Sequence, residues 1–128
     1  MIPSIELQKT IYKVLDKDIY QVYEVVPNVD RMPLITLGSL RKSEDFTKTN
    51  TNRFTFSIMI HGWSIGKSSV ESKMIEEFIY QSIIELEMDD YDVEFVRLAM
   101  NENLKEEETD DKVIFHSIQE FEITIKKN

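Results

Sequence analysis

Apolar residues in the first part of the chain recur with the spacing of one helix face. The i, i+4, i+7, i+8 spacing is shared by Leu7, Ile11, Val14 and Leu15. Such a stripe is typical of a helix that buries one side. Ser4 stands before the stripe and Asp18 just after it. We therefore predict a short amphipathic helix that Ser4 caps and that ends near Asp18.

The spacing then changes to that of strands. Two runs rich in β-branched and aromatic residues predict a short strand near 20–26 and a second over Leu34–Leu40. In the run 53–63 apolar residues occupy every second position, which predicts a strand with one buried face. We expect the last two strands to form a hairpin joined by a polar arm, residues 41–52, which is longer than most hairpin loops.

Helical spacing returns after Ser68. A broad apolar stripe comprises Met74, Ile75, Phe78, Ile79, Ile83 and Leu86. It predicts the main helix, from Ser68 to about Glu87. We then expect a strand over 91–101, an acidic loop over 102–111 and a last long strand over 112–127. In this strand the alternation slips between Ile118 and Phe121, which predicts a bulge.

This order of elements predicts an α+β fold. We expect a single domain, 1–128, with an antiparallel or mixed sheet, a long hairpin arm, the main helix across one sheet face and a short N-terminal helix. The absence of cysteine excludes disulfides and thiolate metal sites and is consistent with a reducing cytosol. The N-terminal residues do not resemble a signal peptide, and no apolar run approaches the roughly 18 residues of a membrane helix, so we expect no membrane partner.

Charge is distributed unevenly. Between Glu85 and Asp111 twelve acidic residues face only two basic ones, whereas the stretch 41–53 is net basic. The simplest interpretation of the acidic run is a solvated loop and its flank. With a formal net charge of −9, the chain is not suited to general DNA or RNA binding, which depends on a basic patch.

The stretch "HGWSIGKSS", residues 61–69, resembles a nucleotide-binding phosphate loop. That motif needs four residues between its glycines, whereas three separate Gly62 from Gly66, and bulky Trp63 follows the first glycine. We interpret the stretch as a tight turn from strand to helix, in which the glycines permit the bend and Ser68 or Ser69 caps the main helix.

Other chemical motifs are incomplete. Asp90, Asp92 and Glu94 alternate as in a calcium loop, but Phe95 stands where that loop requires glycine. The only two histidines, His61 and His116, lie on predicted strands without a third ligand near in sequence, so they do not define a zinc site. No serine has an evident base. We therefore predict neither enzymatic activity nor a cofactor.

Three stretches, "MPLITLGS", the run from Glu44 to Ile83 and "HSIQEFEITI", resemble the tail terminator, or tail completion, family of long-tailed bacteriophages. In that family a P-[apolar]3-x-G strand precedes a polar arm with a segment like D-x-x-T-K, and an alternating strand then ends in W-S before a capped helix. The matching residues are Pro33, Gly38, Asp45, Thr47, Lys48, Trp63 and Ser64. The resemblance covers nearly the whole chain, but the acidic "KEEETDD" has no counterpart in it.

The resemblance implies a structural subunit that closes into a ring, commonly of six copies, on the completed tail tube. Such a ring stops tube growth and joins the head. The implied partners are further copies, the tail tube protein and a head-completion or connector protein, with DNA passing through the ring without sequence-specific binding. The implied location is the head-proximal end of the tail in the virion, after assembly in the host bacterial cytoplasm.

We expect the polar arm to dock on a neighbour's acidic region or on the tube, because a head-to-tail ring joins two different patches. The candidate interaction residues are Arg41, Lys42, Asp45, Thr47, Lys48, Arg53 and Trp63. Alternatives stay open: another head–tail adaptor, a head-closure protein or a tail-tube-like subunit, an acidic inhibitor that mimics DNA, or an enzyme. Self-polymerisation into tubes would indicate a tail-tube-like subunit. Salt-dependent binding to a basic partner would indicate the inhibitor, and nucleotide binding would indicate an enzyme.

Overall fold

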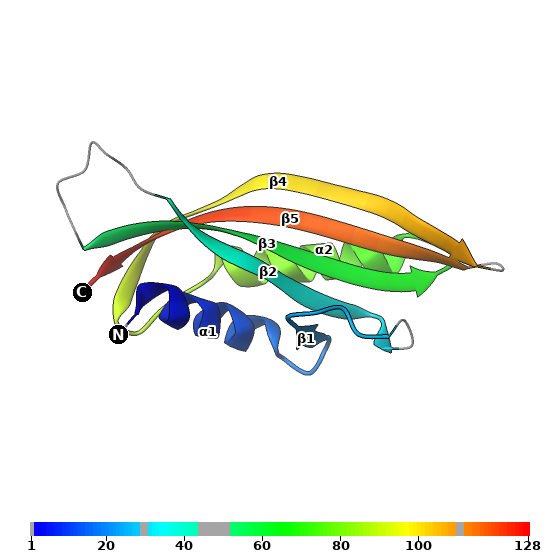
Figure 1. The fold of residues 1–128 in the computed structure, drawn as a ribbon, viewed down its shortest axis with the longest axis horizontal. Coiled ribbons are helices and arrows are strands. Elements are labelled where there is room, and N and C mark those ends of the chain that lie inside the picture. The colour runs from blue at the N-terminus through cyan, green and yellow to red at the C-terminus, as the bar shows by residue number, and fades with distance from the viewer. Residues whose placement is uncertain (1, 29–30, 44–51, 110–111) are drawn as a thin grey trace.

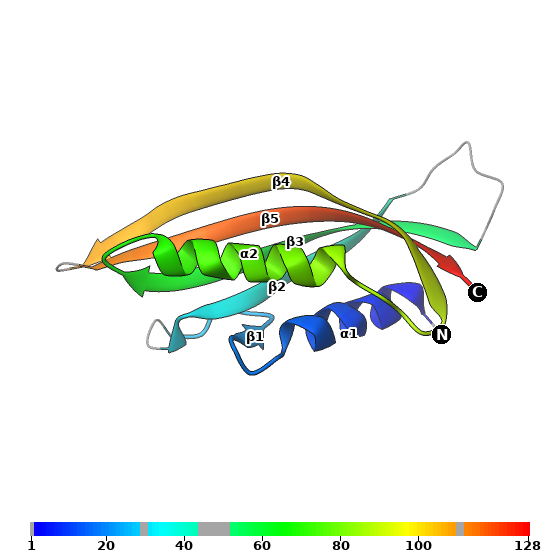
Figure 2. The same ribbon diagram turned by 180° about the vertical axis from the view of Figure 1, so that it is seen from behind.

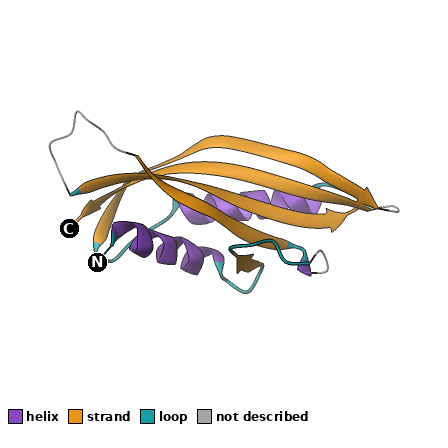
Figure 3. Cartoon of the chain, viewed as in Figure 1, coloured by secondary structure: helices purple, strands orange, loops and turns teal. Residues whose placement is uncertain are grey.

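The computed structural model describes residues 2–28, 31–43, 52–109 and 112–128. Its elements in chain order are α1 (Pro3–Leu15), β1 (Gln21–Tyr23), β2 (Leu34–Ser43), β3 (Arg53–Gly66), α2 (Val70–Ile84), β4 (Tyr91–Thr109) and β5 (Lys112–Lys127). In this part of the chain the strands form one five-stranded sheet in the order β1-β2-β3-β5-β4 (Figures 1 and 3). Only β1 and β2 pair in parallel; the other neighbours are antiparallel. The α+β fold class with a mixed sheet is therefore confirmed.

Both helices pack on the same face of the sheet (Figure 2). One apolar core joins them to the strands. Its fully buried members include Leu7, Ile11 and Leu15 of α1, Ile75, Ile79 and Ile83 of α2, and Ile60, Phe121, Ile123 and Ile125 of the sheet. The stripe predicted for α1 and the alternation predicted for β3 are confirmed in this core. The opposite sheet face carries no helix in the described residues.

The helices differ from the prediction at their ends. Helix α1 begins at Pro3 with Ile2 as its N-cap, so Ser4 lies inside the helix and does not cap it, and the helix ends at Leu15 rather than near Asp18. Proline suits the first helical position because its fixed φ is helical and it has no N–H to leave unpaired. Met74 of α2 belongs to the stripe that was predicted to face the core, but its side chain is 60% exposed. A helix on a sheet buries a narrower stripe than the sequence suggested.

The predicted acidic loop is a strand. β4 continues to Thr109, which pairs with Lys112 of β5. Residues 102–109 therefore form the second half of β4, in a long hairpin with β5. Because β4 is an edge strand, its backbone is paired on one side while the side chains of Asp92, Glu94, Glu102 and Glu106 remain exposed. The loop interpretation was wrong because charge says where a side chain lies, not whether the backbone finds a partner.

The predicted bulge in β5 is also wrong. β5 pairs with β3 without a register shift from Gly66 to Arg53, and the irregularities lie in β4 instead, at 93/95, 98/100 and 105/107. The apparent slip arose because two inward positions of β5 are polar: Ser117 is 0% and Gln119 1% exposed.

The two hairpins lie at opposite ends of the long axis of the molecule (Figure 1). In Figure 1 the end of β2 and the start of β3 lie near both termini, whereas the end of β4 and the start of β5 lie at the far end of the long axis. No helix among the described residues is long and apolar enough to cross a membrane.

Candidate interaction site

The β2–β3 hairpin gathers three of the predicted interaction residues at one end of the sheet. Arg41 is paired with Ser57 and Lys42 with Phe56, while Arg53 is the first residue of β3. These three cations therefore surround the base of the predicted arm. The other predicted arm residues, Asp45, Thr47 and Lys48, lie outside the described residues.

Two of these cations join the arm's base to other strands. Arg41 Nη2 lies 3.0 Å from Glu120 Oε2 on β5. Arg53 donates to both carboxylate oxygens of Glu94 on β4, over 2.5 Å from Nε and 3.1 Å from Nη2. These hydrogen bonds, and then the charge of Glu94, raise the pKa of the Arg53 guanidinium. The bidentate contact ties the first residue of β3 to β4.

Lys42 makes a different contact. Its ammonium lies 5.4 Å from the ring centroid of Phe54, a cation–π geometry, and the residue is exposed. A charge held over a ring at the surface stays accessible to a partner. Lys42 is therefore the described residue of the arm's base best placed to meet an external acidic group.

Trp63 lies at the other end of β3. It is paired with Leu34 and His116, ten residues from Arg53, or about 33 Å along a strand. The structure does not bring Trp63 together with the described residues at the base of the arm. The strand also does not end at Trp63 as predicted, because β3 continues to Gly66.

Trp63 belongs to a cluster on the face away from the helices. Its ring stacks on His116 with centroids 3.7 Å apart, and its Nε1–H donates to Thr36 Oγ1 over 3.0 Å. His116 Nε2 lies 2.7 Å from His61 Nδ1, and His116 Nδ1 lies 2.6 Å from Glu106 Oε1. Burial, and then the charge of His116, lower the pKa of His61. His61 of β3, His116 of β5 and Glu106 of β4 thus form one hydrogen-bonded chain.

Sequence reasoning missed this cluster. It treated His61 and His116 as unrelated strand residues because 54 residues separate them in the chain. The available signal was that His61 and Trp63 occupy alternate, non-core positions of the same strand. No set of three or more His, Asp or Glu among the residues described is placed to hold a metal ion.

The stretch that resembles a phosphate loop is mostly strand. Gly62 pairs with Ile35 on one side and Ser117 on the other. Its backbone is therefore used by the sheet and does not curl around an anion. The turn from strand to helix lies at residues 67–69, so the glycines do not form it as predicted. Ser69 is the N-cap of α2 as predicted, but its side chain makes no capping hydrogen bond. Gly62 serves packing: a Cβ there would lie 2.6 Å from Ile75 Cγ2.

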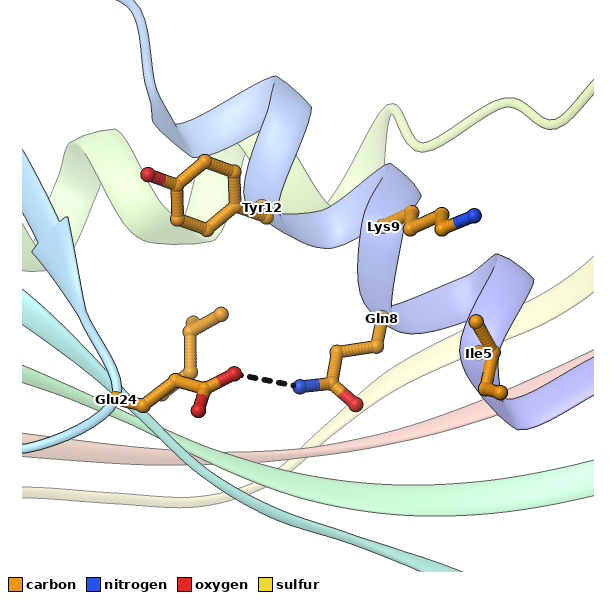
Figure 4. Close-up of a pocket in the computed structure, with 6 residues that line it drawn as sticks. Ile5, Gln8, Lys9, Tyr12 and Glu24 are labelled. Atoms are coloured by element: carbon orange, nitrogen blue, oxygen red, sulfur yellow. Dashed lines mark hydrogen bonds between the residues drawn. The ribbon is translucent and has the colours of Figure 1, made fainter.

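An apolar pocket lies between α1 and the segment after β1. It has a volume of about 360 Å³ and is lined by Ile5, Gln8, Lys9, Tyr12, Glu24 and Leu37. Figure 4 shows Gln8 reaching from α1 to Glu24, where Nε2 donates to Oε1 over 3.1 Å. Ile5 is 45% and Tyr12 43% exposed, so this side of α1 is partly apolar and uncovered. Sequence reasoning missed it because these residues lie off the core stripe.

Comparison with known proteins identifies the fold. No family model matches this chain, and no curated protein matches it by sequence. Among solved structures, the chain is similar to one from the virion of a native gene transfer agent (GTA) particle, with a TM-score of 0.75 and 13% sequence identity. The match covers 98% of this chain and 99% of that one. The two chains therefore share a fold over essentially their whole lengths.

Proposed function

We propose that this protein is a structural virion protein that caps the completed tail tube as a ring, stops its growth and provides the surface for head joining. The observation that carries the proposal is the similarity over nearly full length to a chain of a virion particle, with a TM-score of 0.75. The motifs that resemble the tail terminator family support the same role, with the whole chain, 1–128, acting as one domain without catalytic activity.

The charge distribution is consistent with a head-to-tail ring. Arg41, Lys42 and Arg53 lie at one end of the long axis, and the β4–β5 hairpin, with Glu102 and Glu106, extends to the other (Figure 1). A ring whose contacts are heterologous needs two different, complementary surfaces on each copy. We place the ring at the head-proximal end of the tail, with six copies as the expected number.

A head-closure protein, another adaptor or a tail-tube-like subunit is the alternative. Each would fit the same α+β fold, because fold alone does not determine a role. A tube subunit would polymerise by itself, whereas a terminator would bind only to the end of a tube. Electron microscopy of the purified protein, alone and with tubes, separates these roles.

The decisive experiment is tail length in the parent particle, measured by electron microscopy with the coding sequence intact, deleted and restored. A terminator predicts overlong tails that join no heads after deletion, and normal tails after restoration. Normal tails beside unattached heads would assign the protein to the head side of the joint. Unchanged particles would refute a role in tail assembly.

The arm is tested by charge reversal. Lys42→Glu with Lys48→Glu should abolish capping if the arm docks on an acidic surface. Lys13→Glu with Lys73→Glu is the matched control, since it changes the charge equally at two exposed helix positions away from the arm. Normal capping by the arm variant, or equal loss in the control, would refute docking through the arm.

A further inference from the structure

The sheet has two open edges on opposite sides. Among the described residues β4 pairs only with β5, so its other edge has no strand partner there along Tyr91–Thr109. On the far side, β1 covers β2 only from Leu34 to Thr36. Within the residues described, the outer edge of β2 from Leu37 to Ser43 therefore has no strand partner. Free edges of this kind pair readily with a strand of another chain.

The open edge of β2 forms the floor of a groove whose wall is α1. Beside the pocket of Figure 4 lies a second cavity of about 380 Å³ that shares Gln8, Glu24 and Leu37 with it and continues to Leu40. A third, of about 230 Å³, continues from Leu40 to Lys42. The three cavities follow one another along the edge, so the groove can hold an extended strand.

The wall of the groove is apolar where a bound strand would lie. Ile2 is 58% exposed, and Ile5 and Tyr12 are exposed by 45% and 43%. Exposed apolar side chains beside unpaired backbone groups offer both burial and hydrogen bonding to the same ligand. The groove therefore has the two components of a strand-binding site.

The edge of β4 is complementary to this groove. Phe95 is 48% and Leu104 38% exposed, although both lie on a strand. Among the side chains of β4 that the structure describes, four acids outnumber two bases: Asp92, Glu94, Glu102 and Glu106 against Arg97 and Lys105. The groove is bordered by Lys9 and Lys42 against Glu24. A net acidic strand with apolar residues thus fits a net basic, apolar groove.

We propose that the groove between α1 and the open edge of β2 binds the β4 edge of a second copy, so that the sheet of one copy continues into the next. The inference deepens the proposed ring and rests on it, because it assigns the contact between neighbours. Since the two surfaces differ and lie on opposite edges of the sheet, the contact is heterologous, and repetition closes a ring or extends a fibre.

Cross-linking tests this contact directly, because the chain contains no cysteine. Ser39, on the open edge of β2, and Ala99, in β4, are both exposed, so Ser39→Cys and Ala99→Cys introduce one thiol on each surface. With a short bismaleimide, mixing the two variants should give a dimer that neither variant gives alone. A dimer from Ala99→Cys alone would overturn the proposal in favour of a symmetric contact between two β4 edges.

Particles that carry both substitutions extend the test to the assembled state. A ladder of cross-linked copies is expected there. Absence of cross-links in both purified protein and particles would overturn the proposal. Overlong tails after deletion, without cross-links, would refute this contact and leave the terminator role standing. Cross-links together with normal tails after deletion would support this contact and refute the terminator role.

Surface substitutions test the wall of the groove. Ile5→Glu and Tyr12→Glu should each weaken self-association about tenfold, the effect of losing about 1.4 kcal/mol of binding free energy. Val70→Glu and Met74→Glu, at positions 62% and 60% exposed on α2, are the matched controls. Sedimentation equilibrium measures the dissociation constants, and circular dichroism checks the fold. Equal effects in both pairs would overturn the assignment to the groove.

Discussion

Replacing Gly62 by alanine tests the role assigned to the strand that resembles a phosphate loop. An added Cβ would lie 2.5 Å from Ser117 Oγ and 2.6 Å from Ile75 Cγ2. Both neighbours are buried, at 0% exposure for each, so neither has free space into which to move. The methyl group must therefore push α2 away from the sheet.

The expected cost follows from this crowding. Forcing one extra carbon into a packed core costs about 1–3 kcal/mol, and two contacts below 3 Å place Gly62→Ala near 2–3 kcal/mol. The unfolding entropy of about 2.1 cal/mol/K per residue, over 128 residues, makes each kcal/mol worth about 4 °C in melting temperature. We expect the melting temperature to fall by about 7–11 °C.

Gly66 supplies the matched control within the same motif. Nothing lies within 4 Å of a Cβ added there, and its φ is not positive. Gly66→Ala should therefore stabilise the protein by about 0.4–1 kcal/mol, because alanine restricts the unfolded chain. Thermal unfolding followed by circular dichroism measures both variants. The packing argument would be refuted if Gly62→Ala had the same melting temperature as the unmodified protein, or if its melting temperature changed as that of Gly66→Ala does.

Two further predictions concern the partly buried His61 and the buried hydroxyl of Tyr91. Burial, and then the charge of His116, lower the pKa of His61, so as the pH drops below about 6.5 the unfolded chain binds more protons than the folded one and the free energy of unfolding decreases. Urea titrations should show this loss, and His61→Gln should reduce it; an unchanged pH profile would contradict the assignment. The Tyr91 hydroxyl is buried with no hydrogen-bond partner in the described structure, so Tyr91→Phe should leave stability unchanged or raise it by up to about 1 kcal/mol. A clear drop in melting temperature would reveal a partner.

The sequence alone determined the parts of this fold that depend on local periodicity. Leu7, Ile11 and Leu15 form the buried stripe of α1, and alternate residues from Phe56 to Ile60 form the buried face of β3, as predicted. Such patterns are readable because the period of a helix or strand sets which side chains share a face. The order of elements, and hence the fold class, followed from the same information.

Candidate sites were predicted only where their members are neighbours in sequence. Arg41, Lys42 and Arg53 flank one hairpin, and they do lie at the same end of the sheet. Trp63 was assigned to the same set through the resemblance, and β3 carries it to the opposite end. A list of residues from one stretch of chain contains no measure of how far an extended strand separates them.

Tertiary structure decided the features that depend on partners far along the chain. Backbone pairing with β5 makes a strand of the acidic segment around Glu102, although its composition is that of a loop. The approach of β3, β4 and β5 joins His61, His116 and Glu106, and the close packing of α2 accounts for Gly62. Periodicity along a chain records which face of an element is buried. Which other element covers that face, or continues an open edge, depends on contacts that no single stretch of sequence contains.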